Sequence, residues 1–259
     1  MVPRSRLAAA VAAFAAITYS CGPATTPSAI DPGLASCVTS AAVFLAGLDL
    51  DRLRASPLYP KLAPAVAMAI EPLRNASNLV VISDGKELVF VARGKFRETP
   101  AGATLIEPDL AISGPAGAVR SAIAQHKTGT TGAPDLVGQA TAIAGNQEIW
   151  AAVRGRITLP LTGNTANLNR LLHQVDYATL TVRLDAGIAL DLRGASRTAD
   201  EGQRLEETLR AVVTLAGAAN RRLDALLRAV EIRRKGPFVH ATLSTDADAV
   251  GALIGELTR

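Results

Sequence analysis

The sequence predicts an α+β fold built from two strand–helix–hairpin–helix units, with an antiparallel sheet covered by helices on one face. Three observations lead to this prediction. The Asp84–Gly85 pair joins two β-rich runs and supplies the positive φ that a two-residue hairpin turn needs. Over residues 180–184, apolar side chains alternate with Thr and Arg, which is the period of a half-buried strand. Over residues 198–229, apolar residues recur with the spacing of one helix face.

Composition and patterning divide the chain into four segments. With 259 residues, 49% of them hydrophobic and 19% charged, the chain is long enough to bury a hydrophobic core without disulfides or a structural metal. We expect a signal peptide at 1–20, a flexible tether at 21–39, a first α+β unit at 40–138 and a second at 139–259. The units are expected to lie side by side or to share one sheet.

The first unit is predicted to contain one hairpin and two helical segments. Four prolines lie between residues 56 and 76, and each removes a backbone donor, so the helix there should be short or kinked. In chain order, we expect an extended run at 41–50, a helical segment at 56–76, the hairpin at 78–94, an extended piece at 103–114, a helix at 118–127 and a connecting loop at 128–138.

The second unit loosely repeats this order and contains the longest predicted helix. Thr198 and Glu201 have the spacing of a capping box at its start. In chain order, we expect a strand at 147–157, a helix at 165–175, a hairpin at 177–196 that turns near Asp185, the long helix at 198–229, a hairpin at 230–244 that turns near Lys235–Gly236 and a closing helix at 246–258.

Short fragments recur in the two units. Val-Ala-Arg-Gly-Lys (91–95) and Ala-Val-Arg-Gly-Arg (152–156) each end a predicted strand, and the turn Ile-Ser-Gly-Pro-Ala-Gly-Ala-Val-Arg-Ser-Ala-Ile (112–123) leads into a helix. With the tether, these features resemble uncharacterised bacterial exported lipoproteins with repeated α+β units. The resemblance implies a place in the cell envelope and no particular activity.

The N-terminus has the pattern of an export signal. Residues 1–6 carry two arginines and no acid, and the apolar run 7–17 is too short to span a bilayer. The following Thr18-Tyr19-Ser20-Cys21 resembles the lipobox of bacterial lipoproteins. That resemblance implies cleavage before Cys21 and diacylation of its thiol, which makes Cys21 the lipid-attachment residue and the membrane a partner. Gly22, where Asp would favour retention, points to the outer membrane facing the periplasm.

Cys21 has a rival interpretation, because the chain has a second cysteine, Cys37. A disulfide between them is chemically reasonable in an oxidising compartment. It would close a loop of about 16 residues, worth about 3 kcal/mol, inside a tether that has little fold to stabilise. Plain secretion and an uncleaved anchor are the remaining alternatives.

No catalytic, metal or cofactor site is expected. The three histidines, at 126, 173 and 240, lack metal-ligand spacing. Ser113 lacks the flanking glycines of a nucleophile elbow. The Gly114–Gly117 turn is expected to begin a helix rather than to bind an anion. Two acidic pairs are also not expected to form a site. Asp49 and Asp51 lack the full ligand spacing of a Ca²⁺ site, and Asp246 and Asp248 are expected in the first turn of a helix, where carboxylates complement the helix dipole.

The charge balance disfavours a nucleic-acid partner. The formal net charge is +4, and two of the arginines belong to the predicted signal peptide. The basic residues concentrate at Arg221, Arg222, Arg228, Arg233, Arg234 and Lys235, without interleaved aromatics. A solvated helix face and a charged hairpin edge explain them.

The sequence therefore predicts a lipid-anchored envelope protein that is not an enzyme and acts as an interaction or assembly module with an unknown protein partner or lipid. The alternative is a periplasmic carrier of an apolar ligand such as a lipid. A large apolar pocket would favour the carrier, a flat exposed apolar patch the interaction module, and converging polar groups with shifted pKa values an enzyme.

Overall fold

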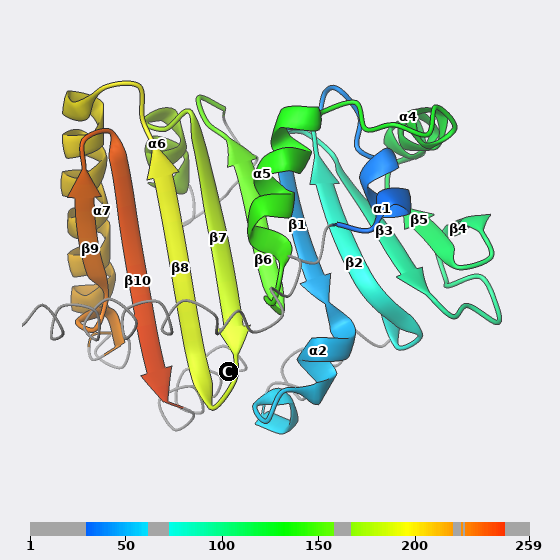
Figure 1. The fold of residues 1–259 in the computed structure, drawn as a ribbon, viewed down its shortest axis with the longest axis horizontal. Helices are drawn as coiled ribbons and strands as arrows, with labels where there is room; N and C mark the ends of the chain where they lie inside the picture. The colour runs from blue at the N-terminus through cyan, green and yellow to red at the C-terminus, as the bar shows by residue number, and fades with distance from the viewer. Residues whose placement is uncertain (1–29, 62–72, 158–166, 220–223, 225, 247–259) are drawn as a thin grey trace, which may run out of the picture.

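A computed structural model describes residues 30–61, 73–157, 167–219, 224 and 226–246. Ten strands form a single antiparallel sheet in the order β4-β5-β3-β2-β1-β6-β7-β8-β10-β9 (Figure 1). The strands are β1 (Phe44–Asp49), β2 (Ala76–Ser83), β3 (Leu88–Gly94), β4 (Thr104–Glu107), β5 (Leu110–Ser113), β6 (Ile149–Arg154), β7 (Tyr177–Leu184), β8 (Gly187–Ala195), β9 (Glu231–Lys235) and β10 (Phe238–Asp246). The helices are α1 (Pro32–Ser36), α2 (Leu50–Ala55), α4 (Ala116–His126), α5 (Pro134–Ala144), α6 (Asn167–His173) and α7 (Ala199–Ala219).

The two halves of the sheet meet at its centre, where β1 pairs antiparallel with β6. Gly47 lies opposite Trp150 in this ladder, and the indole ring occupies the space that a side chain at position 47 would need. The shared register makes one continuous sheet, which answers whether the two halves lie side by side or share a sheet.

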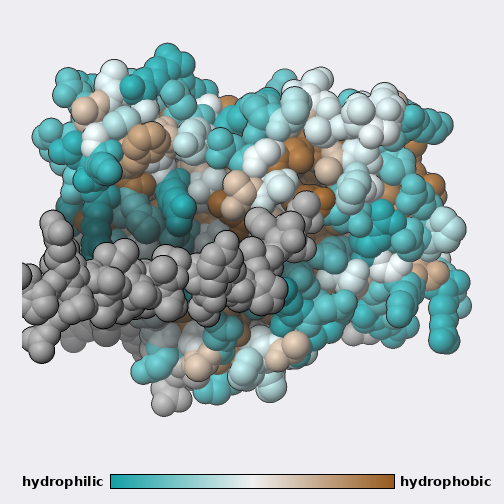
Figure 2. All heavy atoms as spheres, in the orientation of Figure 1, coloured by the Kyte–Doolittle hydropathy of each residue, from teal (hydrophilic) through white to brown (hydrophobic). Residues whose placement is uncertain are grey.

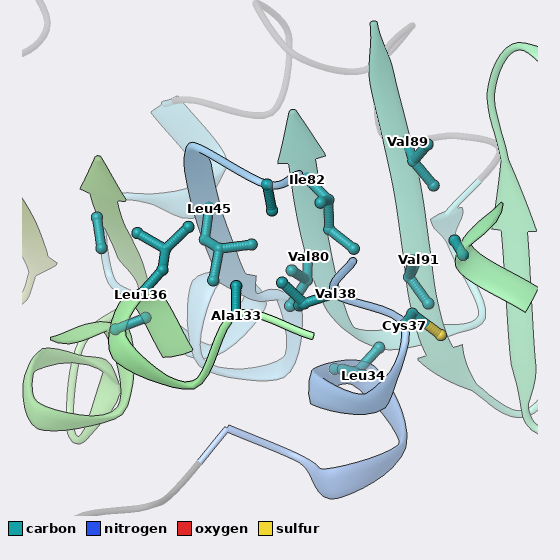
Figure 3. Packing of buried hydrophobic residues seen from close by; sticks show 14 of the residues in the cluster. Leu34, Cys37, Val38, Leu45, Val80, Ile82, Val89, Val91, Ala133 and Leu136 are labelled. Carbon is teal, nitrogen blue, oxygen red and sulfur yellow. The ribbon is translucent and has the colours of Figure 1, made fainter. Parts of the chain in front are cut away.

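Helices cover both faces of the sheet, which corrects the expectation of helices on one face. We call the side that carries Leu45, Val80 and Trp150 the Trp150 face, and the opposite side the Leu180 face. On the Trp150 face, α1, α4 and α5 bury the first half of the sheet and the central strands (Figure 3). The aliphatic side chains of neighbouring strands point into this core, so the first half is sealed on this side.

The Leu180 face has two smaller cores. Leu50 and Leu53 of α2 pack on Leu79 at one end. Leu205 and Leu209 of α7, together with α6, pack on β8, β9 and β10 at the other. The long amphipathic helix therefore covers a sheet, as its apolar face indicates.

The predicted hairpins are confirmed. β2 and β3 turn at Asp84–Gly85, where Gly85 has φ 90° and Asp84 accepts from the Lys86 and Glu87 N–H groups. β9 and β10 turn at Gly236, with φ 60°. The hairpin over 177–196 forms β7 and β8. The turns at Gly85 and Gly236 follow from local chemistry, since glycine adopts positive φ at no steric cost.

Two elements were predicted wrongly. The loop expected at 128–138 gives way to α5, which starts with Pro134 at its first turn and buries Leu136, Ala140 and Ala144 on one face. The piece at 103–114 is a hairpin of two four-residue strands, β4 and β5. The helix α5 also crosses the predicted unit boundary at 138/139 and packs on β1, β6 and β7 of both halves.

Helix bounds also differ from the predictions. Within 56–76, residues 62–72 lie outside the described residues, while the helix found nearby, α2, starts earlier and is capped by Asp49. The predicted long helix is described as α7 up to Ala219. The predicted closing helix lies outside the described residues apart from Asp246, which is the last residue of β10.

The tether ends earlier than predicted. Asp31 caps α1 by accepting hydrogen bonds from the Gly33 and Leu34 N–H groups, at 2.9 and 3.1 Å. Leu34 and Cys37 are buried against the sheet. Residues 30–39 thus belong to the folded body, because Leu34 and Cys37 are buried and Asp31 caps the helix. The Pro- and Ser-rich composition of this segment does not indicate these contacts.

Replacing Gly47 by Ala is expected to lower the free energy of unfolding by about 2 kcal/mol, because the new Cβ would overlap the Trp150 ring and overpacking costs about 1–3 kcal/mol. The matched control is Gly138→Ala in α5, where no atom lies within 4 Å of the new Cβ. That change should stabilise by about 0.5–1 kcal/mol. Urea unfolding followed by circular dichroism measures both. Equal effects of the two substitutions would contradict the packing at the sheet centre.

Candidate functional site

Cys21, the predicted lipid-attachment residue, lies outside the described residues, so lipidation stays a prediction. The other cysteine, Cys37, is a free thiol with no exposed surface. Burial, and to a smaller extent the Glu107 carboxylate, raises the pKa of Cys37 to about 12. A thiol in this environment is inert. Within the described ranges, no helix is long and apolar enough to cross a membrane.

The histidines lie on separate elements. His126 and His173 end α4 and α6, and His240 lies in β10, as predicted. Across the described part of the chain, no three His, Cys, Asp or Glu side chains come close enough to hold a metal ion.

One histidine belongs to a chain of hydrogen bonds that looks like a catalytic triad. His126 Nδ1 lies 2.7 Å from Ser36 Oγ, and His126 Nε2 lies 3.2 Å from Glu107 Oε1. Ser36 Oγ also lies 2.8 Å from the Gly33 carbonyl, which competes with His126 Nδ1 for the single hydroxyl proton. Ser36 is also buried, and neither residue lines the cavities described below. The arrangement ties α1 to α4 and β4.

Arg93 stands beside this chain as the centre of an ion-pair network. Its guanidinium contacts Asp31 at 2.9 Å, Asp109 at 2.7 Å and Glu107 at 3.4 Å. Burial alone would lower the pKa of Arg93, but the hydrogen bonds that Arg93 donates to Asp109 and Asp31 outweigh it and raise the pKa. The network joins α1 to β3 and the β4–β5 hairpin, while the buried Nε of Arg93 has no hydrogen-bond partner among the described residues.

The remaining sequence candidates have structural partners. Ser113 Oγ donates to the Gly102 carbonyl at 2.8 Å. Asp49 caps α2, and Asp51 pairs with Arg54 at 3.1 Å. The Gly114–Gly117 turn leads into α4. Three of the concentrated basic residues form ion pairs: Arg228 with Asp224, Arg233 with Glu231 and Arg234 with Glu206. Arg221 and Arg222 lie outside the described residues, as does the acidic candidate Asp248.

A polar hollow lies on the Trp150 face of the second half. It has a volume of about 680 Å³ and a floor made by β7, β8 and β10, with residues of α5 along one side. The part of this surface that is visible in Figure 2 is hydrophilic and recessed. Its described lining is Ala142, Ile143, Gln147, Thr179, Thr181, Arg183, Ala189, Leu190, Asp191, Arg193, Ala229, Glu231, Thr242, Leu243 and Ser244.

Asp191 organises the floor of the hollow. It accepts from Arg193 Nε at 2.9 Å and lies 2.8 Å from His240 Nε2. Desolvation alone would raise the Asp191 pKa, but the hydrogen bonds from Arg193 and His240 outweigh it and hold the pKa below its usual value. The carboxylate is therefore ionised at neutral pH and contacts the Arg193 guanidinium and the His240 imidazole.

An apolar groove lies on the Leu180 face, behind the same strands. It has a volume of about 360 Å³ and lies between the sheet and the helices α6 and α7. Leu171 and Leu205 come from the helices, and Leu180 and Leu192 from β7 and β8. The full lining is Phe44, Ala151, Val153, Leu171, Leu172, Val175, Ala178, Thr179, Leu180, Leu192, Arg193, Gly194, Leu205, Leu209 and Val239.

The alternation of apolar residues with Thr and Arg over residues 180–184 predicts one strand with a polar side, and it does not predict the hollow. Asp191 of β8 and His240 of β10 lie on the same face as this polar side. Predicting the hollow therefore requires the strand order and the register of the sheet.

Comparisons with known proteins add two solved structures. Crystal forms I and III of TP0453 each align with a TM-score of 0.49, at 10% and 9% sequence identity. The alignments cover 90% and 88% of this chain and 100% and 99% of those chains. No protein-family model matches the chain, and no curated protein matches it. No ligand or activity is inferred from these matches.

The acid stability of the protein should depend on Asp191. A carboxyl whose folded pKa is lowered contributes stability above its unfolded pKa, about 3.9, and that contribution is lost as pH falls through the folded pKa. Asp191→Asn is expected to reduce stability at pH 7 and to flatten its fall below about pH 4. Thermal melts from pH 2 to 7 measure this, and an unchanged slope below pH 4 would refute the assignment.

Proposed function

We propose that this protein is a lipid-anchored envelope protein that shelters one apolar chain, such as the acyl chain of a lipid, in the groove on its Leu180 face. The observation that carries the proposal is the groove itself. Ligand pockets fall within roughly 300–1,000 Å³ and are mostly apolar. A volume of about 360 Å³ lined almost entirely by aliphatic side chains suits a single acyl chain.

The energetics favour an apolar occupant. Leu171, Leu180 and Leu192 are only half-buried, so they expose apolar surface inside the groove. Each methylene of a bound chain would gain about 0.8 kcal/mol on leaving water. The guanidinium of Arg193 is held on the opposite face by Asp191, so no charged side chain of the described lining competes for this space.

The anchor is part of the proposal. Cys21 follows the signal-like segment, and the thiol that could bridge to it, Cys37, is buried and free. This supports acylation of Cys21 over the disulfide. Two or three acyl chains hold a protein at a membrane, whereas one gives only marginal binding. An outer-membrane position facing the periplasm would place the groove near a source of lipid.

We also propose that the sheet arose from two copies of one unit. Counted outward from the centre, the strand orders β1-β2-β3-β5-β4 and β6-β7-β8-β10-β9 are equivalent. Arg93–Gly94 in β3 and Arg193–Gly194 in β8 then occupy matching strands and the same face. The fragments 91–95 and 152–156, which the sequence suggests as a repeat, do not match in this way. The first ends β3, the third strand from the centre, and the second ends β6, which is a central strand.

An interaction module is the second candidate. Leu88 and Phe90, on the Leu180 face of β3, are 46% and 40% exposed. An exposed apolar pair of this kind suits a protein contact. These two side chains line neither the groove nor the hollow, whereas the groove has a volume of about 360 Å³, so the carrier is preferred over the interaction module favoured by the sequence. Neither candidate includes a catalytic step.

Filling the groove should abolish binding of an apolar probe. Ala178→Phe places a ring among the lining residues, and Leu180→Gln replaces an aliphatic side chain by a polar one of similar length. We expect each change to weaken binding of a fluorescent long-chain fatty acid at least about tenfold, since two lost methylene contacts are worth about 1.6 kcal/mol. Fluorescence titration of the full-length protein measures this.

The matched control is Ala189→Phe, which adds the same ring on the Trp150 face. It should leave fatty-acid affinity unchanged. Equal affinity in wild type, Ala178→Phe and Leu180→Gln, with circular dichroism showing all three folded, would exclude the carrier. Native mass spectrometry that finds a protein partner, and no lipid, on the purified chain would favour the interaction module.

Acylation of Cys21 is tested by metabolic labelling. The full chain expressed in a bacterium should incorporate a palmitate analogue, and Cys21→Ala should lose the label because no other accessible thiol remains. Cys37→Ala serves as the control and should keep the label. Equal labelling of wild type and Cys21→Ala would overturn the anchor.

A further inference from the structure

We propose that the polar hollow on the Trp150 face is a binding site for a neutral, hydroxyl-rich ligand, namely a glycan chain. The inference goes beyond the proposed function and does not depend on it, because the hollow and the groove lie on opposite faces of the same strands.

The Trp150 face is apolar and buried in the first half of the sheet and polar in the second half. In the first half, Val80, Val91 and Ile112 are fully or almost fully buried under helices. The corresponding strands of the second half carry polar side chains there, including Thr181 and Thr242. Among the described residues, no helix covers β8 and β10 on this side. The second half therefore presents a concave polar surface where the first half has a core.

Threonine hydroxyls in the hollow make no hydrogen bonds within the described part of the chain. Thr179 lines the hollow, and its hydroxyl is not one of the buried side-chain atoms that lack a partner there, which are Arg93 Nε and Gln174 Oε1. The Thr179 hydroxyl therefore keeps accessible surface, and a hydroxyl both donates and accepts hydrogen bonds. The hydroxyls of Thr181 and Thr242 are likewise without protein partners among the described residues. The hollow thus offers several hydrogen-bonding groups that a ligand could use.

The charges of the lining select a neutral ligand. Its described residues include two guanidinium groups, Arg183 and Arg193, and two carboxylates, Asp191 and Glu231. An anion would meet the carboxylates and a cation the guanidinium groups, so neither sign is favoured overall. Hydroxyl groups both donate and accept, and they can bond to all four. Ala142 and Ile143 add an apolar wall that suits the C–H face of a sugar ring.

Ion pairs fix the side chains before a ligand arrives. Asp191 holds Arg193 and His240, and Glu231 holds Arg233 at 2.7 Å. Side chains that are already ordered lose less entropy on binding. At about 680 Å³, the hollow has room for several sugar units.

The test uses the full-length protein and a panel of neutral tetrasaccharides of N-acetylglucosamine, glucose and mannose, with a sulfated heparin tetrasaccharide for comparison. Isothermal titration should show at least one neutral tetrasaccharide binding with a Kd below about 1 mM. Thr181→Val, which keeps the shape and removes the hydroxyl, should weaken that binding about 5- to 10-fold. Ala189→Phe should weaken it at least about tenfold by filling the hollow, and Ala178→Phe, on the other face, should leave it unchanged.

Three results would overturn the proposal. The first is that no neutral tetrasaccharide binds below about 1 mM. The second is a neutral ligand whose affinity is the same in wild type, Thr181→Val and Ala189→Phe. The third is tighter binding of the sulfated sugar than of any neutral one. Circular dichroism confirms folding of each variant, and the isosteric Thr181→Val keeps the test decisive if Ala189→Phe does not fold.

Discussion

The antiparallel pairing of β1 with β6 is the interaction on which the rest of the structure depends. It joins five strands on either side into one sheet, so that residues near positions 45 and 152 share a face although about a hundred residues separate them in the chain. Gly47 allows this pairing, because the Trp150 ring fills the space beside it. The helix α5 then crosses the junction and seals it. Without this ladder each half would expose an open edge of its sheet.

The continuous sheet makes the two faces of its second half chemically different. Alternation along β7 and β8 sends Leu180 and Leu192 to one side and Thr181 and Asp191 to the other. The apolar side receives α6 and α7 and keeps a groove beneath them, while the polar side forms a hollow that no described helix covers over β8 and β10. Both proposed binding sites thus follow from one pleated surface whose two sides are covered to different extents.

The local elements could be predicted from the sequence, and their long-range arrangement could not. Asp84–Gly85 and Gly236 fix their turns through their own backbone chemistry. The helix α5 was missed because the Gly- and Thr-rich residues before Pro134 indicate a loop, and only contact with the sheet buries its Leu136 face. The order of ten strands depends on contacts between distant residues, which no local pattern encodes.

The same limit applies to the candidate sites. Leu180 and Asp191 are recognisable as inward and outward positions of separate strands, but whether such residues line a groove or a hollow depends on which helices lie above them. Cys21 is the opposite case, because its interpretation depends only on the residues before it. Conversely, Ser36, His126 and Glu107 come together only in the fold, and their hydrogen bonds then explain them as structural.

The central claim is that the groove on the Leu180 face accepts an apolar chain. Methyl-resolved NMR during titration with dodecanoic acid tests it most directly, because Leu and Thr methyl groups report on the two faces separately. The account predicts saturable shifts at Leu171, Leu180 and Leu192 and unchanged signals at Thr181 and Thr242. Shifts confined to the Thr methyls, or no shift at the groove leucines at saturating probe, would contradict it.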